Sequence, residues 1–230
     1  MSKSSSNMFF LGFFLCAVCV GATAVMGGAA LLTKGPIEKA SARKIAGSLR
    51  RILPDFDNDP LKNVCTVSGV RFYTAKKQSV VVGYAGEVSV NSGYGGKMEA
   101  LISFYPDGKI RHFVVTDHSE TPGLGSLAVE RVNPVTVRSL FCGKKVQKSG
   151  SLPPNRILDQ YSGQSLKGSS RWRQPWLLTK EGGDVEDLTG ATISSRAVNE
   201  LAWKCSNAFL KFLALQQNQP SSPGVSSGRK

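Results

Sequence analysis

The segment MEALISFYPDGKIRHFVVT, residues 98–116, decides the class of fold. Apolar side chains occupy every second position from Met98 to Phe104, the spacing that places them on one face of a β-strand. The residues Pro106-Asp-Gly108 favour a tight turn, and a second strand-like run returns from Ile110 to Thr116. The segment therefore predicts an antiparallel β-hairpin.

Further strands are predicted on both sides of this hairpin. Upstream, Val64 to Val90 is rich in β-branched and aromatic residues, and glycines divide it into short runs. Downstream, Val129 to Val137 has a weaker strand pattern that Pro134 interrupts, and Trp176-Leu-Leu178 fits one more short strand. The middle of the chain is therefore predicted to be mainly β-structure.

The carboxyl-terminal helix has the clearest pattern in the chain. Apolar residues recur there at steps of three and four, which forms a stripe along one face of an α-helix. The stripe comprises Val198, Leu201, Ala202, Cys205, Ala208, Phe209, Phe212 and Leu213. We expect this stripe to lie across the sheet. The sequence therefore predicts an α+β fold, which is a twisted antiparallel sheet with packed helices. Residues 216–230 are rich in Pro, Ser and Gly and are predicted to be a disordered tail.

The amino-terminal region contains a candidate membrane anchor, placed at residues 1–34. Met8 to Leu32 contains no charged residue, a run long enough to cross a hydrocarbon core about 30 Å thick. It exceeds the roughly 7–15 residues of a signal-peptide core. Small residues at Ala22-Thr-Ala24 and Gly28-Ala-Ala30 leave cleavage open as an alternative. The length favours one uncleaved transmembrane helix.

A second helix is predicted from Ile37 to Leu53, where apolar residues share a face and Pro54 ends the pattern. Within residues 35–60 this helix is either a stalk that links the anchor to the soluble domain or an ordinary packed helix.

Composition narrows the possible partners. The formal net charge is +13, but the basic residues are scattered, so nucleic-acid binding is not expected. The five cysteines do not form a disulfide framework: Cys16 and Cys19 lie in the apolar run, and Cys65, Cys142 and Cys205 lie far apart. The sequence shows no zinc-ligand spacing, and no metal site is predicted.

The stretch Asp187-Leu-Thr-Gly-Ala-Thr192 comes directly before the carboxyl-terminal helix. A helix amino terminus has unpartnered backbone N–H groups and a partial positive charge, so it suits a phosphate. Thr192 stands at this terminus after two small residues, where its hydroxyl can be a covalent attachment point. The simpler interpretation is that Thr192 caps the helix, a role that threonine fills well.

A second motif, His118-Ser-Glu-Thr-Pro-Gly-Leu-Gly125, directly follows the hairpin. Pro122 restricts the backbone, and two glycines allow another group to approach it closely. Glu120 and Thr121 add polar side chains. Such a loop on its own is structural more often than functional, and the role of His118 is left open.

Together the two motifs resemble the FMN-binding domain shared by the G subunit of the Rnf electron-transport complex and the C subunit of the sodium-pumping NADH:quinone reductase. The resemblance runs from the anchor to about Leu215, and residues 61–215 are predicted to form this domain. A short chain with one anchor favours the Rnf branch. The segments that carry the resemblance are Gly93-Tyr-Gly-Gly96, His118–Gly125, Ile157–Leu166 with its Gln160-Tyr161 pair, and Glu181–Ser195 with the flavinylation signature Asp-x-x-(Ser/Thr)-Gly-Ala-Thr.

The resemblance implies roles for individual residues. Thr192 would carry FMN through a phosphoester bond that a separate flavin transferase makes, reading Asp187. Gly190 and Ala191 would leave room for the transferase and the phosphate. The other cofactor-binding candidates are Thr189, Ser194 and Ser195 for the phosphate, and Glu120, Thr121, Gly123, Leu124 and Tyr94 for the flavin.

The resemblance also implies an electron-carrier subunit. The complex would exchange electrons between ferredoxin and NAD and couple this to ion translocation, and the subunit would turn over no substrate alone. Its partners would be the other membrane subunits, the flavin transferase and the lipid bilayer. Two alternatives stay open: an FMN-binding subunit of another membrane reductase, and an anchored scaffold without flavin.

Flanking charge and family resemblance disagree about the side of the membrane. Lys34, Lys39, Arg43 and Lys44 follow the span and only Lys3 precedes it, so the positive-inside rule places the soluble domain in the cytoplasm. The resemblance implies a single-pass inner-membrane protein with a periplasmic domain. Because long domains can translocate despite their flanking charge, we expect the periplasmic side.

Overall fold

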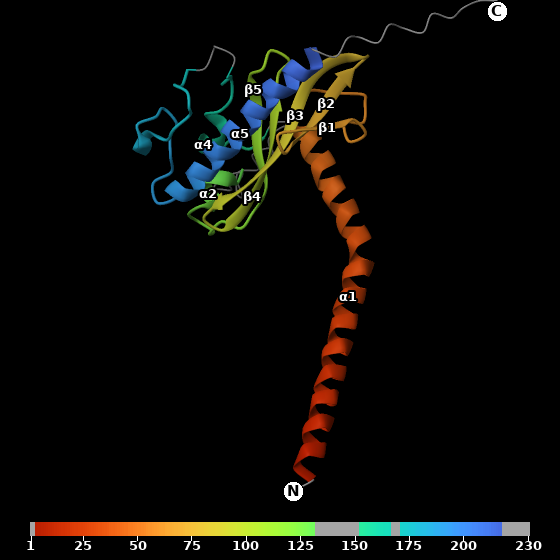
Figure 1. Ribbon diagram of the computed structural model, residues 1–230. Coiled ribbons are helices and arrows are strands. Elements are labelled where there is room, and N and C mark those ends of the chain that lie inside the picture. Colours follow the sequence, from red (N-terminus) through yellow and green to blue (C-terminus); the bar gives the residue numbers. More distant parts are fainter. Residues whose placement is uncertain (1–2, 132–151, 167–170, 218–230) are drawn as a thin grey trace, which may run out of the picture. The chain divides into compact units, whose positions relative to one another are not determined.

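The computed structural model describes residues 3–131, 152–166 and 171–217 (Figure 1). Internal contacts divide the chain into two units, Met1–Ala46 and Gly47–Lys230. The first is helical from Lys3 onward, and the second contains the sheet and the candidate site.

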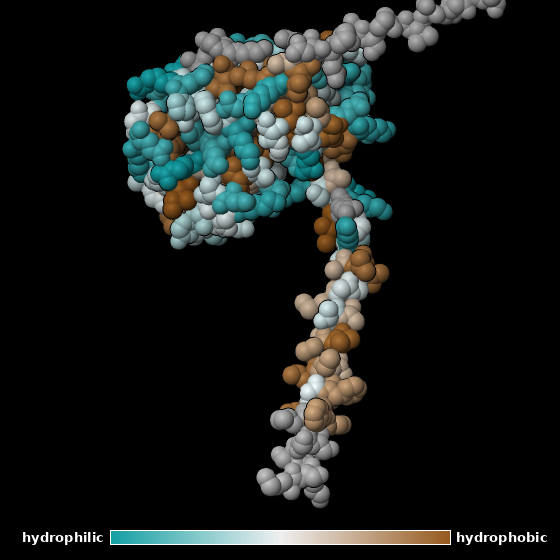
Figure 2. All heavy atoms as spheres, in the orientation of Figure 1, coloured by the Kyte–Doolittle hydropathy of each residue, from teal (hydrophilic) through white to brown (hydrophobic). Residues whose placement is uncertain are grey.

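Helix α1 (Lys3–Ile52) is one continuous helix that joins the predicted anchor to the predicted stalk. Its part from Phe9 onward is long and apolar enough to cross a membrane. Large apolar side chains such as Phe10 and Leu32 are exposed on it, and Figure 2 shows mostly apolar residues along the side in view. The helix continues through Pro36 and ends just before Pro54, where the sequence predicted its end.

Among the residues that the structure describes, five antiparallel strands form one sheet in the order of the sequence. Each pairs with the next along the chain, so the predicted hairpin is confirmed as β4 and β5, with Ile102 opposite Phe113. At its turn, the Gly108 N–H donates to the Tyr105 carbonyl at 3.0 Å. The strands are β1 (Val64–Val67), β2 (Val70–Lys77), β3 (Val80–Gly93), β4 (Gly96–Phe104) and β5 (Ile110–His118).

Helix α5 (Thr192–Gln217) packs against one face of this sheet (Figure 1). Every residue of the predicted apolar stripe is buried, which confirms the stripe and the α+β class. At the centre, the Phe209 ring stacks on Phe104 with centroids 4.1 Å apart and tilts against Phe72 at 5.8 Å. Because α5 begins at Thr192, this packing fixes where the signature stretch lies.

Short elements connect the sheet to α5. In the described part of this connection they are α2 (Ser126–Val129), α4 (Arg156–Asp159) and the 3-10 helix η1 (Thr179–Glu181). The strand predicted from Val129 is wrong where the structure describes it, because Val129 ends α2; residues 132–137 lie outside the described residues. The strand predicted at Trp176–Leu178 is reduced to a single bridge from Leu178 to Val185.

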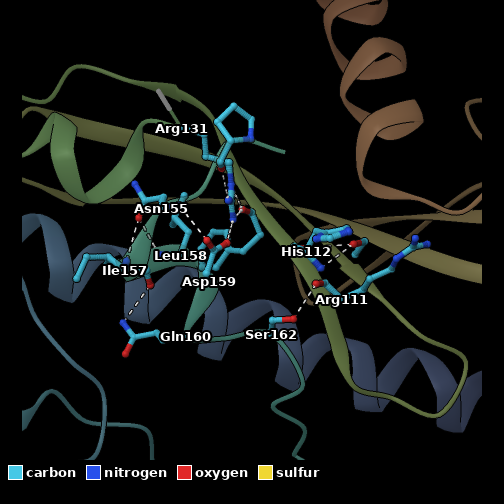
Figure 3. Close-up of polar contacts among 12 residues, drawn as sticks. Arg111, His112, Arg131, Asn155, Ile157, Leu158, Asp159, Gln160 and Ser162 are labelled. Atoms are coloured by element: carbon cyan, nitrogen blue, oxygen red, sulfur yellow. Dashed lines mark hydrogen bonds and ion pairs between the residues drawn. The ribbon is translucent and has the colours of Figure 1, made fainter. Parts of the chain in front are cut away.

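A largely buried arginine, Arg131, holds the residues just before α4, and α4 itself, against strand β5 (Figure 3). The Arg131 guanidinium donates to the carbonyl oxygens of Phe113 (3.1 and 2.9 Å) and Pro153 (2.8 Å), and pairs with Asp159 at 2.7 Å. Asn155 caps α4, because its side-chain oxygen accepts the N–H groups of two residues in that helix. These bonds position α4 and the residues that follow it.

The remaining sequence predictions concern the cysteines and the tail. Cys16, Cys19 and Cys65 are exposed and free, and Cys205 is free and buried in the core, where burial raises the pKa of its thiol. Cys142 lies outside the described residues. Helix α5 extends to Gln217, two residues into the predicted tail. The rest of the tail is not described.

Candidate functional site

The signature stretch forms a tight turn that leads into α5. The Ala191 N–H donates to the Leu188 carbonyl at 3.0 Å, and Gly190 has a φ of 86°. This left-handed conformation is costly for residues with a Cβ, which explains a glycine here. Packing within the protein does not require a glycine, because the nearest atom to an added Cβ is 4.0 Å away, on Leu124. The room that Gly190 would leave for the transferase and the phosphate stays a prediction.

Ser195 stabilises this turn from inside. Its side chain is buried, and its hydroxyl oxygen accepts the Leu188 N–H at 3.0 Å. Its own N–H donates to the Ala191 carbonyl at 2.9 Å, at the start of α5. Ser195 therefore shapes the turn, and its expected contact with a phosphate stays a prediction.

The second motif forms a compact loop between β5 and α2. The Thr121 carbonyl accepts the N–H groups of Leu124 at 3.3 Å and Ser126 at 3.2 Å. The Gly123 N–H donates to the Ser126 hydroxyl at 3.0 Å, and Gly123 has a φ of 77°. Gly123 therefore allows the loop to turn, and Leu124 is left 54 % exposed.

Glu120 joins the two motifs. Its buried carboxylate accepts the Ser194 hydroxyl at 2.5 Å and the Gly95 N–H at 3.3 Å. A Cβ at Gly125 would lie 2.7 Å from the Ser194 hydroxyl oxygen, and one at Gly93 would lie 2.7 Å from the Glu120 carboxylate. These glycines thus allow the close approach of three segments that are distant in sequence.

His118 supports the same loop. Its Nδ1 accepts the Glu120 N–H at 3.3 Å, and its Nε2 lies 3.5 Å from the Glu130 carboxylate. The imidazole thus orients the backbone at Glu120.

The assembled motifs enclose a hollow of about 420 Å³. Ligand pockets commonly have volumes of roughly 300–1,000 Å³. Three large apolar side chains remain partly exposed on its walls: Tyr94 (69 %), Leu124 (54 %) and Ile193 (46 %). The full lining is Tyr94, Glu120, Thr121, Leu124, Gly125, Gly190, Ala191, Thr192, Ile193 and Ser194.

Eight of the twelve candidate residues line this hollow, and four lie around it. The four are Gly123 and Ser195, which shape the backbone, the exposed Thr189, and Asp187. Gly125 and Ile193 line it without having been candidates. Ile193 follows Thr192 in the first turn of α5, so it could have been inferred from the helix start.

Asp187 lies behind Thr192 and is held by two residues of η1. Its side chain is 6 % exposed and pairs with the Lys180 ammonium at 2.8 Å, and it accepts the Thr179 hydroxyl at 3.1 Å. The hydrogen bond from Lys180 is the main reason that the pKa of Asp187 is lowered, and the Thr179 bond adds to it, while partial burial opposes both. The same ammonium donates to Thr192 Oγ1 at 2.9 Å.

Lys180 and Thr179 were not identified from the sequence. The chain must reverse at Gly182, whose φ is 80°, before Lys180 can reach Asp187 and Thr192. A Cβ at Gly183 would collide with the Leu177 backbone. The Gly182-Gly183 pair was the available signal, but a sequence turn does not reveal which side chains it brings together.

Gln160 ties this region to α4. Its side-chain oxygen accepts the Glu186 N–H at 2.8 Å, and its side-chain nitrogen donates to the Glu186 carbonyl at 3.0 Å. The neighbouring Tyr161 is buried, and its hydroxyl donates to Asn199 of α5 at 3.3 Å. Gln160 therefore positions the residue next to Asp187, and Tyr161 ties the same turn to α5.

Comparison with known proteins identifies the domain. The family model of the FMN-binding domain matches residues 93–207, which span the hollow and its supports. The chain belongs to the FMN-binding domain family. This confirms the resemblance drawn from the sequence motifs.

Relatives of this chain share one name, which describes them as the G subunit of an ion-translocating oxidoreductase complex. The protein of Cereibacter sphaeroides is 31 % identical over 72 % of this chain and 68 % of its own length. That of Photorhabdus laumondii is 29 % identical over 79 % of both chains. That of Haemophilus influenzae is 28 % identical over 85 % of this chain and 86 % of its own. The similarity thus extends well beyond the residues matched by the domain model.

The residues of the hollow fit an FMN. Its apolar walls suit a flavin ring, and the first turn of α5 supplies N–H groups and partial positive charge for a phosphate. Thr192 lies on the wall at that turn. Lys180 adds a cation 2.9 Å from the Thr192 hydroxyl oxygen.

Proposed function

We propose that this protein is an electron-carrier subunit of a membrane ion-translocating oxidoreductase complex, with FMN joined to Thr192 through a phosphoester bond. The observation that carries the proposal is the position of Thr192. Thr192, the first residue of α5, lines a hollow of about 420 Å³, and its hydroxyl oxygen lies within hydrogen-bonding distance of a lysine. The names of the relatives support the role in such a complex.

The protein's residues contribute position and environment. Bound FMN would supply the redox chemistry. Tyr94, Leu124 and Ile193 present apolar surface on which a flavin ring can lie while part of it stays accessible to an electron partner. The helix terminus and Lys180 place positive charge at the phosphate end. A covalent bond at Thr192 would prevent loss of the cofactor from this open site.

The proposed attachment is testable by flavin fluorescence in denaturing gels. The full chain, expressed in membranes with a flavin transferase, is expected to give a fluorescent band. Thr192→Ala and Thr192→Val should abolish the band because neither offers an oxygen for the ester, and Thr192→Ser should retain it. Thr66→Ala, at an exposed threonine of β1, is the matched control and should not change it.

Two results would contradict this proposal. One is a dark wild-type band when the transferase labels another substrate, which would favour an anchored scaffold without flavin. The other is a Thr192→Ala protein that still carries covalent flavin, which would move the attachment elsewhere.

We assign the sheet-containing unit to the periplasmic side of the inner membrane, anchored by α1. The exposed Cys65 of β1 offers a test of this orientation. In spheroplasts, a membrane-impermeant maleimide is expected to label a variant in which Cys16, Cys19 and Cys142 are replaced by Ser. A further Cys65→Ser change should abolish the labelling. Labelling only after membrane disruption would place the domain in the cytoplasm, as the flanking lysines indicate.

The proposed complex exchanges electrons between ferredoxin and NAD, and this protein passes them on without a substrate of its own. Purification of the tagged full chain from membranes should recover the other subunits of such a complex. Recovery of the subunits of a different membrane reductase would be consistent with the flavin role but would contradict the assignment to this complex.

A further inference from the structure

One ammonium group connects the signature aspartate to the candidate attachment hydroxyl. Lys180 Nζ lies 2.8 Å from Asp187 Oδ2 and donates to Thr192 Oγ1 at 2.9 Å. The Asp187 side chain is 6 % exposed, whereas the Lys180 side chain is 48 % exposed. The aspartate therefore anchors the lysine from behind, and the lysine contacts the hydroxyl.

The segment that carries Lys180 is held in place by further bonds. Gly182 ends η1 in the left-handed conformation, and its N–H donates to the Thr179 carbonyl at 3.1 Å. The Thr179 hydroxyl bonds to Asp187, and Arg196 of α5 pairs with Glu181 of η1 at 2.7 Å. The lysine therefore projects from a fixed turn, so that less side-chain freedom is lost when it holds the hydroxyl.

The chemistry of ester formation defines what this lysine can do. An ammonium has three donors and no acceptor, so it occupies a lone pair of Oγ1 and cannot take the hydroxyl proton. Its charge stabilises the negative charge that develops on Oγ1 as the proton leaves. It also stabilises negative charge on the oxygens of the phosphoryl group that Oγ1 attacks. The lysine thus aims and activates the hydroxyl without acting as the base.

We infer that Lys180 is the positioning residue for esterification of Thr192, and that Asp187 acts on this reaction through Lys180. The inference rests on the proposed function. In the step, Thr192 Oγ1 forms a bond to the FMN phosphorus of a flavin phosphoanhydride held by the transferase. The anhydride P–O bond breaks, its electron pair leaves with the departing phosphate, and the hydroxyl proton passes to a base of the transferase.

The test compares initial rates of covalent flavin incorporation into the detergent-solubilised full chain, with purified transferase and a flavin phosphoanhydride. Lys180→Met is expected to slow incorporation about tenfold or more, because charge-assisted hydrogen bonds are among the stronger ones. Lys180→Arg restores a cation and should recover most of the rate. Lys109→Met is the matched control. The Lys109 side chain is 47 % exposed, its ammonium lies 3.2 Å from the Asp107 carboxylate, and it does not line the hollow.

A double variant tests whether Asp187 acts through Lys180 or is read directly by the transferase. Asp187→Asn alone is expected to slow the reaction, because it releases the lysine. In a Lys180→Met background the same change should have no further effect, within about twofold for sites that act as one unit. An undiminished effect of Asp187→Asn in that background would show that the transferase reads the aspartate directly, and would overturn the second half of the inference.

The failure of this inference is distinct from failure of the proposed function. A wild-type rate for Lys180→Met, with Thr192→Ala unlabelled, overturns the role of Lys180 and leaves the flavin attachment intact. Absence of labelling in the wild type contradicts the attachment itself. The unfolding temperature of each variant, measured without flavin, identifies one that is misfolded. If Lys180→Met is misfolded, Lys180→Gln, which keeps a hydrogen-bond donor without the charge, takes its place. Lys180→Gln is expected to slow incorporation, and a wild-type rate would overturn the inference.

Discussion

The hydroxyl of Ser194 donates a hydrogen bond of 2.5 Å to the carboxylate of Glu120, which lies 74 residues away in the sequence. Through this bond the first turn of α5 meets the loop that follows β5. The same carboxylate accepts the Gly95 N–H from the β3–β4 turn. Glu120 therefore connects the three segments that form the hollow, and its first role is to support the site.

Glu120→Ala is expected to destabilise the protein. It leaves the Ser194 hydroxyl and the Gly95 N–H without their acceptor, and a buried polar group without a partner costs about 1–3 kcal/mol. Guanidinium unfolding of the solubilised full chain without flavin, followed by tryptophan fluorescence, measures the loss. Glu200→Ala, which removes the acceptor of an exposed bond from Ser92, is the control and should cost less. Equal losses for the two variants would contradict the supporting role.

Gly190→Ala is expected to destabilise the turn before Thr192. The φ of 86° is unfavourable for alanine by about 1–2 kcal/mol. Asn tolerates this conformation better, so Gly190→Asn should cost less. The free energy of unfolding without flavin measures both variants. Should alanine and asparagine be equally harmful, the cause would be space and not backbone conformation.

The ion pair of Asp187 predicts a pH dependence. The hydrogen bond from Lys180 holds the pKa of Asp187 below the unfolded value of 3.8. The folded state thus binds this proton less readily, so the stabilisation is present above pH 3.8 and is lost as the pH falls below it through the folded pKa. The difference in unfolding temperature between the wild type and Asp187→Asn should therefore shrink on acidification through this range. A difference that is constant across the range would contradict the ion pair.

Gly86→Ala is expected to overpack the interface between β3 and α5. Its Cβ would lie 2.5 Å from Cys205 Sγ and 2.9 Å from the Phe72 ring. Overpacking of a core costs about 1–3 kcal/mol. Removing the sulfur with Cys205→Ala should reduce the cost of the glycine change, and a double-mutant cycle on unfolding measures the coupling. Strict additivity would show that the sulfur is not the obstacle.

Local patterns predicted most of the fold. The hairpin of residues 98–116 is confirmed because alternating side chains and a Pro-Asp-Gly turn act over neighbouring residues. Helix α5 is confirmed because its apolar stripe has the period of an α-helix. The strand expected at Val129 is wrong, because apolar composition alone does not distinguish a short buried helix from a strand.

The candidate site was predictable where a motif lies in one stretch of chain. The signature and the loop at His118–Gly125 do lie side by side around a hollow. The inward role of Ser195 and the turn-forming role of Gly123 were missed, because both depend on hydrogen bonds within the folded turns. The assignment of the lining residues to FMN stays a prediction until the variants are measured.

The sequence by itself determined most of the secondary structure, the family and the position of Thr192 at a helix start, because each depends on residues close together in the chain. Only the tertiary structure brought Lys180 to Asp187 and Thr192, and Glu120 to Ser194. Such contacts follow from the packing of α5 on the sheet and from left-handed turns at Gly182 and Gly190. Packing and backbone reversal act between distant residues, and no local pattern in the sequence specifies which side chains they bring together.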